Sequence, residues 1–239
     1  MHPTRRGRPG FTLIELLIAV GIIVILIGLI LPALGRTRET GRRVVCASNL
    51  RQVHASYAAY AADNSGLVPL GYRSGRKQFN SMVYSTTTKK YCLFGILYLD
   101  KRMTDPQVFF CPSEEDPQSM FNSETNPWPP GPPANAGKNG YAGYGCRPEV
   151  DLPDEFHKID GVRVPRLSQF KDKAIFADLV AMPDRLDYRH RQGVNVLYGD
   201  GSVGWVKREA FEDSLNACTA ISPAANPHQD KIWAALDKG

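Results

Sequence analysis

Residues 10–34 read GFTLIELLIAVGIIVILIGLILPAL, and this stretch decides how the rest of the chain is organised. No charged residue occurs from Leu16 to Leu34. As a helix this run would extend about 28 Å, close to the hydrocarbon thickness of a bilayer. One carboxylate, Glu15, lies just inside its N-terminal end, and an unpaired acid in a membrane helix costs about 3 kcal/mol. The run predicts a membrane helix whose glutamate needs a partner.

Two general rules leave the fate of this helix open. Arginines flank it on both sides, so the positive-inside rule does not choose an orientation: Arg5, Arg6 and Arg8 precede it, and Arg36 and Arg38 follow it. A secretory signal peptide is the main alternative to an anchor. Signal peptides usually have a shorter apolar core and no internal acid, and both features argue for the anchor.

The string Gly-Phe-Thr-Leu-Ile-Glu-Leu-Leu at residues 10–17, after a short basic leader, resembles the leader of type IV prepilins and type II secretion pseudopilins. The resemblance implies that a prepilin peptidase removes residues 1–10 by cutting after Gly10, and that Phe11 is then N-methylated. It also implies that the new ammonium of Phe11 pairs with Glu15 of a neighbouring subunit, since two buried opposite charges compensate each other. Cytoplasmic cleavage would place the N-terminus in the cytoplasm and export the head from a single-pass protein of the bacterial inner membrane.

Helical periodicity continues beyond the apolar run. Apolar residues recur at spacings of three and four from Val44 to Tyr60, and the stop signal DNSG follows from residue 63. We therefore expect a transmembrane segment over 11–35 and an amphipathic continuation over 36–64. Many pilins carry a proline that kinks or locally melts the helix at the position of Pro32.

The residue pattern of the sequence changes after residue 65. Short β-prone runs alternate with Gly, Pro and Asp, which predicts an exported head over 65–239 with an antiparallel sheet. The expected fold class is α+β and pilin-like, a long N-terminal helix packed on that sheet. A Pro-rich stretch near 112–140 predicts a long exposed loop; Trp128 could anchor a partner there, but a solvent loop is favoured. The tail after residue 206 predicts one or two short helices packed against the head.

A second signature lies near the C-terminus, where Asp200 and Gly201 follow His190 after nine intervening residues. Alternating residues on both sides predict a hairpin with Asp-Gly at its tip. Together with CASNLRQVH (46–54) and FFCPS (109–113), this segment resembles a bacterial subfamily of pilin-like proteins with a C-terminal His-x9-Asp-Gly segment. The favoured interpretation is that His190 bonds to backbone beside the hairpin and Asp200 supplies turn geometry.

A metal is the alternative for this segment, with Asp178, Asp187, His190 and Asp200 as candidate ligands. Calcium is the ion considered, because major pseudopilins often hold it in a C-terminal loop. Calcium needs six to eight oxygens and no dense Asp/Asn loop is visible, so we expect no cofactor. A catalytic role would need a nucleophile, and none is marked, so no catalytic residue and no enzyme activity are predicted.

The chain has five cysteines, and an exported head would expose them to oxidation. Two disulfides with one cysteine left over would fit. A pair among Cys92, Cys111 and Cys146 is preferred because all three lie in the middle of the head. No C-x-x-C spacing occurs, which argues against a zinc site.

These observations predict a structural subunit of a type IV pilus-like filament or a type II secretion pseudopilus. Its expected partners are other pilin-like subunits, the prepilin peptidase and an inner-membrane assembly platform. One alternative is a minor pilin whose head binds a metal or binds DNA through Arg73, Arg76 and Lys77. Nucleic acid is not an expected partner, since part of the formal charge of +5 belongs to the leader. A second alternative is an exported hydrolase or binding domain on a pilin-like anchor.

Overall fold

The computed structural model describes residues 12–71, 75–103, 105–135, 137–148, 158–159, 162–163 and 165–239. The chain divides into two units, Met1–Gly41 and Arg42–Gly239. Helix α1 (Leu13–Asp63) contributes its first part to one unit and its second part to the other. It is assigned as one helix throughout, so it does not melt at residue 32.

The described part of the first unit is the N-terminal part of α1, and most of it is apolar. The segment Leu13–Leu31 has a mean hydropathy of 3.1, and none of it is buried within the protein. Among the described residues, one helix is long enough and apolar enough to cross a membrane, and this segment is part of it. Exposing leucine and isoleucine side chains to water is unfavourable. This segment therefore requires lipid or other apolar helices around it.

The second unit contains a four-stranded antiparallel sheet in the order β4-β7-β8-β9. Its strands are β4 (Tyr144–Cys146), β7 (Ala174–Asp178), β8 (Gly193–Tyr198) and β9 (Val203–Lys207). A smaller sheet has the order β2-β1-β3. Its strands are β1 (Met82–Ser85), β2 (Lys90–Tyr91) and β3 (Gly140–Tyr141), and a separate two-stranded pair joins β5 (Lys158–Ile159) to β6 (Val162–Arg163).

Short helices complete the second unit. The α-helices are α2 (Phe94–Leu99), α3 (Pro183–Asp187), α4 (Glu212–Asn216) and α5 (Asn226–Leu236). The 3-10 helices are η1 (Pro106–Phe109), η2 (Leu167–Phe170), η3 (Arg208–Ala210) and η4 (Pro223–Ala225). The predicted tail helices are α4 and α5, and they pack on the head as expected. The α+β, pilin-like architecture expected from the sequence is confirmed.

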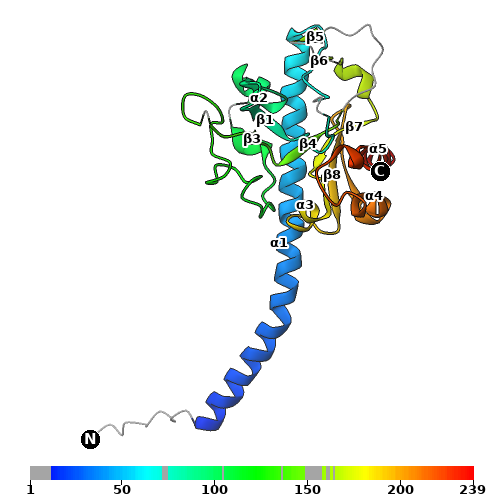
Figure 1. Ribbon diagram of the computed structural model, residues 1–239. Coiled ribbons are helices and arrows are strands. Elements are labelled where there is room, and N and C mark those ends of the chain that lie inside the picture. The colour runs from blue at the N-terminus through cyan, green and yellow to red at the C-terminus, as the bar shows by residue number, and fades with distance from the viewer. Residues whose placement is uncertain are drawn as a thin grey trace, which may run out of the picture. The chain divides into compact units, whose positions relative to one another are not determined.

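The central strands β7 and β8 of the four-stranded sheet are buried on both faces because each face has its own helical cover. Along β8, Val194 and Val196 pack with residues of α4 and α5, whereas Leu197 packs with residues of α1. In Figure 1 the second part of α1 lies beside β4, β7 and β8, with α4 and α5 on the far side of those strands. Both strands β7 and β8 are accordingly buried along their full length.

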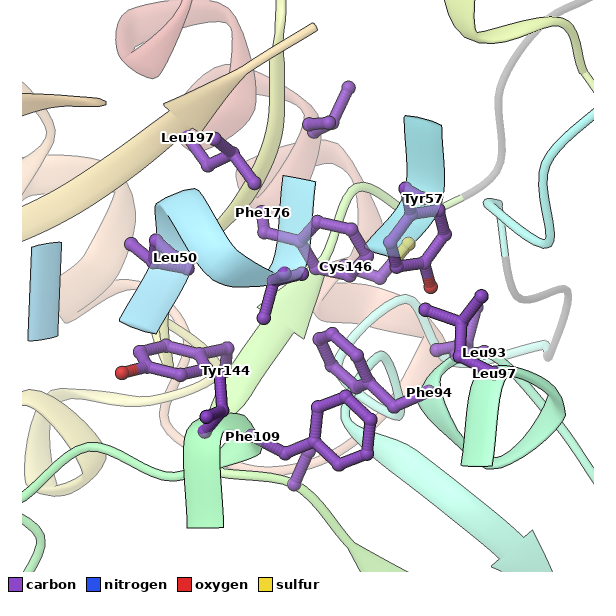
Figure 2. Close-up of a cluster of buried hydrophobic side chains, with 14 of the residues drawn as sticks. Leu50, Tyr57, Leu93, Phe94, Leu97, Phe109, Tyr144, Cys146, Phe176 and Leu197 are labelled. Carbon is purple, nitrogen blue, oxygen red and sulfur yellow. The ribbon is translucent and has the colours of Figure 1, made fainter. Parts of the chain in front are cut away.

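The core on the α1 side is aromatic (Figure 2). Tyr57 of α1 and Phe94 of α2 both contact Phe176 of β7, with ring centroids 5.0 Å and 4.6 Å apart. The buried stripe of α1 is Cys46, Leu50, Val53, Tyr57 and Tyr60. The predicted periodicity is confirmed from Leu50 onward, while Val44 is exposed because the stripe enters the core at Cys46.

Candidate functional site

The N-terminal end of α1 is closed by a reciprocal pair of hydrogen bonds. Oε2 of Glu15 accepts from the backbone N–H and from the hydroxyl of Thr12, both at 2.9 Å. Oγ1 of Thr12 accepts from the backbone N–H of Glu15 at 3.3 Å. This is a capping box, which satisfies backbone donors that the first helical turn leaves without partners. The sequence carries the Thr-x-x-Glu signal of a capping box at residues 12–15, but the prediction of the helix did not rest on this motif.

The capping box gives Glu15 partners within its own chain, at the helix end where the dipole favours negative charge. The predicted cleavage and methylation residues, Gly10 and Phe11, lie outside the described residues. The pairing of Glu15 with an ammonium of another subunit stays a prediction.

The C-terminal signature forms the expected hairpin. Strands β8 and β9 are joined by residues 199–202, and Gly201 in this turn has a φ of +89°. A carboxylate oxygen of Asp200 accepts from the hydroxyl and the backbone N–H of Ser202, at 2.7 Å and 2.8 Å. These hydrogen bonds lower the pKa of Asp200 because they favour its charged form. The side chain of Asp200 therefore stabilises the turn between β8 and β9.

The tip of this hairpin rests on α1. Nε2 of His54 lies 3.0 Å from the carbonyl oxygen of Gly199. A Cβ at Gly201 would lie only 2.7 Å from Nδ1 of His54. The hairpin therefore fits against the helix only with glycine at this position.

His190 lies in a buried cluster, next to Asn195 of β8 and Trp205 of β9. Its Nε2 is 3.3 Å from Sγ of Cys111, 3.4 Å from Sγ of Cys46 and 3.7 Å from Oδ2 of Asp178. This nitrogen therefore faces side chains, and the expected hydrogen bond between His190 and the backbone stays a prediction. The potential ligand atoms of these four residues all lie within 4.8 Å of one another, and all four residues are buried.

Separate elements bring the four residues together. Cys46 belongs to α1, Cys111 follows η1, Asp178 ends β7, and His190 lies between α3 and β8. Three of the four come from patches that the sequence singled out: CASN, FFCPS and the His-x9-Asp-Gly segment. Asn49, in the first patch, donates from Nδ2 to the carbonyl oxygen of Phe110 in the second, at 3.1 Å.

The disulfide prediction is wrong in its partner. The structure joins Cys46 to Cys111, with their Cα atoms 5.3 Å apart, and Cys92 and Cys146 take no part in a disulfide. The sequence separation is 65 residues, and the bond forms because the segment after η1 packs against α1. Cysteine spacing carries no information on such a contact.

The other two predicted metal ligands lie elsewhere. Asp187 forms an ion pair with Arg208, with Nη1 and Oδ1 2.6 Å apart, and its side chain is half exposed. Asp200 is engaged by Ser202 in the hairpin turn. Of the predicted set, the structure brings together Asp178 and His190.

Neighbouring groups fix the buried cluster. Oδ2 of Asp178 accepts from the backbone N–H of Asn195 at 2.7 Å and from its Nδ2 at 3.2 Å. Trp205, paired with Asn195 across β8 and β9, meets the ring of His190 edge-on at 5.7 Å. The guanidinium of Arg43 stacks over Trp205, 3.3 Å from its ring centroid, as a cation–π pair.

The Pro-rich segment is less exposed than predicted. Trp128 packs edge-on against Tyr98 at 5.0 Å and also contacts Phe110 and Phe121. Asn126 is buried and accepts from the backbone N–H of Tyr141 in β3. Trp128 therefore anchors its own loop to the head.

The candidate DNA patch is partly engaged within the chain. Lys77 forms an ion pair with Asp230 of α5, with Nζ and Oδ1 2.5 Å apart. Arg76 lies over the ring of Phe79, and Arg73 lies outside the described residues. This patch therefore offers less cationic surface than the sequence implied.

Comparison with known proteins identifies the family. Residues 5–31 match the family described as the prokaryotic N-terminal methylation motif. The type IV wide pilus major component of Thermus thermophilus is 30% identical over 97 residues, which cover 38% of this chain and 74% of that protein. The chain belongs to the type IV pilin-like family. No solved structure matches it.

Within this pilin-like chain the matched motif spans the capping box and most of the apolar run. Membrane anchoring by this segment of α1 follows from the motif and from its hydropathy. The buried cluster around His190 lies outside the motif, in the pilin-like head.

Proposed function

We propose that this protein is a structural subunit of a type IV pilus-like filament or of a type II secretion pseudopilus. The observation that carries the proposal is the apolar first part of α1, which lies within the methylation motif and is not buried by its own chain. A filament supplies what this helix lacks, because packed helices of other subunits exclude water from its leucines and isoleucines.

The proposed maturation begins in the bacterial inner membrane, with the N-terminus in the cytoplasm and the head exported. Prepilin peptidase cuts after Gly10, Phe11 is N-methylated, and an assembly platform adds the subunit to the filament. The carboxylate of Glu15 then pairs with the ammonium of Phe11 in a neighbouring subunit. Each charge is costly alone in an apolar filament core, so the pair favours the register in which they meet.

The first test is the N-terminus of the protein recovered from membranes, read by intact mass and terminal peptide sequencing. We expect a chain that begins at methylated Phe11. A chain that begins near residue 36 would indicate signal-peptidase release, and an unprocessed Met1 would indicate a plain anchor. Either result would contradict the proposed maturation.

Two substitutions separate the assembly role of Glu15 from its capping role. Glu15→Ala removes both the charge and the cap, whereas Glu15→Gln keeps a side chain that a capping box accepts and removes only the charge. If the charge pair drives assembly, both variants lose most filaments in sheared fractions and in electron micrographs. Wild-type filament yield from Glu15→Gln would show that the cap alone matters and would refute the charge pair.

A further inference from the structure

The buried cluster of the head contains the side chains that bind soft and borderline metals. Its residues are Cys46, Cys111, Asp178 and His190. We propose that, when the two cysteines are reduced, these four residues bind one Zn²⁺ ion. The disulfide is then the metal-free, oxidised form of the same site. This inference does not depend on filament assembly, because all four residues lie in the second unit, Arg42–Gly239.

The geometry of the cluster suits a four-coordinate ion. Zinc lies about 2.3 Å from sulfur and about 2.1 Å from nitrogen or oxygen, so tetrahedral ligand atoms lie roughly 3.4–3.8 Å apart. Nε2 of His190 already lies 3.3 Å and 3.4 Å from the two sulfur atoms, and 3.7 Å from Oδ2 of Asp178. Once the sulfur–sulfur bond is broken, only a small separation of the two thiolates is needed.

The surroundings restrain two of the four proposed ligands. Asn195 donates twice to Oδ2 of Asp178, which fixes the carboxylate, and Trp205 packs against the imidazole of His190. A groove of about 480 Å³ has Asn49, Phe110 and Cys111 in its wall, so one of the four residues borders it.

The chemistry of the donors selects the metal. Two thiolates and an imidazole favour zinc or another borderline ion, whereas calcium binds oxygen ligands. The absence of a C-x-x-C motif argued against zinc at the level of sequence. That argument fails here because each ligand comes from a different segment of the chain, so no short spacing records the site.

A phosphine reductant converts the disulfide form into the dithiol form that binds Zn²⁺. A trialkylphosphine breaks the bond between the two sulfur atoms, and phosphorus supplies the two electrons. Water supplies the oxygen of the resulting phosphine oxide and the protons of the two thiols. Zn²⁺ then displaces both thiol protons as it binds.

Cobalt substitution tests the site in the full-length protein. The chain, purified from membranes in detergent and reduced with phosphine, is titrated anaerobically with Co²⁺ and then with Zn²⁺. We expect one Co²⁺ per chain, with a thiolate-to-cobalt charge-transfer band and the intense visible bands of a tetrahedral ion, and displacement by one Zn²⁺. No charge-transfer band at one equivalent would overturn the proposal.

Variants locate the ion. The double variant Cys46→Ser/Cys111→Ser should abolish the charge-transfer band, and Asp178→Asn should weaken Co²⁺ binding at least tenfold while the oxidised protein keeps its disulfide. Cys92→Ser is the matched control and should bind as wild type does. A band that survives in the double variant, or disappears in Cys92→Ser, would place the metal elsewhere.

A measurement on the unaltered chain covers the case in which the variants do not fold. Stoichiometric Zn²⁺ should slow the reoxidation of Cys46 and Cys111 by oxidised glutathione at least tenfold, as read by peptide mapping, and a chelator should restore the rate. Equal rates with and without Zn²⁺ would refute the site.

Discussion

At the residue scale, one glycine decides whether the C-terminal hairpin can rest on α1. Gly201 combines a φ of +89° with a close approach to the ring of His54. A side chain at this position would meet both a disfavoured backbone conformation and a filled space. The Asp-Gly pair in the sequence predicted the turn, but the contact with His54 is visible only in three dimensions.

Gly201→Ala should therefore lower the free energy of unfolding by at least about 2 kcal/mol, since strain and overlap add. Gly137→Ala is the matched control, because it lies in open space and should change stability by less than about 0.5 kcal/mol. Denaturant unfolding of the two variants in detergent provides the comparison. Equal midpoints would show that the hairpin tip can move away from the helix.

At the element scale, the segment between η1 and β3 shows how a loop without regular structure can still be fixed. Its described residues form turns and bends, yet Trp128 and Phe121 insert aromatic rings beside Phe110. The segment also carries Glu114, which forms a buried ion pair with Arg189. Removing one partner of such a pair is costly, so the segment is held by both apolar and charged contacts.

Trp128→Ala should release this segment while the sheet stays folded. Loss of a half-buried indole costs about 2–3 kcal/mol, and most of that loss falls on the loop it anchors. We expect limited proteolysis within residues 112–135 to accelerate at least tenfold. Tyr188→Ala, at a side chain that is 47% exposed, is the control. Cleavage no faster than in that control would mean that Trp128 does not anchor the loop.

At the scale of the whole molecule, local patterns predicted the elements, and long-range contacts determined how the elements meet. The spacing of Leu50, Val53 and Tyr57 predicted the buried stripe of α1, and the Asp-Gly turn predicted β8 and β9. The bond between Cys46 and Cys111 could not be predicted, because it depends on packing across 65 residues. The burial of Trp128 was missed in part for the same reason, since one of its aromatic partners is Tyr98 of α2, outside the Pro-rich run.

The aromatic core also gives the whole head a dependence on pH. Burial raises the pKa of Tyr57 and of Tyr144 well above the ordinary value, because a phenolate would lose its hydration there. Burial likewise raises the pKa of the Cys92 thiol to about 12. Burial of Arg189 lowers the pKa of its guanidinium. By itself this shift would make the free energy of unfolding rise with pH, opposite to the effect of the tyrosines. The carboxylate of Glu114, however, keeps the guanidinium protonated.

The sign of the effect follows from which state keeps its protons. Above about pH 10 the tyrosines of the unfolded chain lose protons that the folded chain retains, so the free energy of unfolding falls as pH rises. Each buried tyrosine should contribute a loss of about 1.4 kcal/mol between pH 8 and pH 11. Tyr57→Phe and Tyr144→Phe should each remove that share of the decline, whereas Tyr188→Phe, at a half-exposed ring, should retain it. Urea unfolding at the two pH values measures the decline, and equally steep losses in all three variants would show that the buried phenols ionise within the folded head.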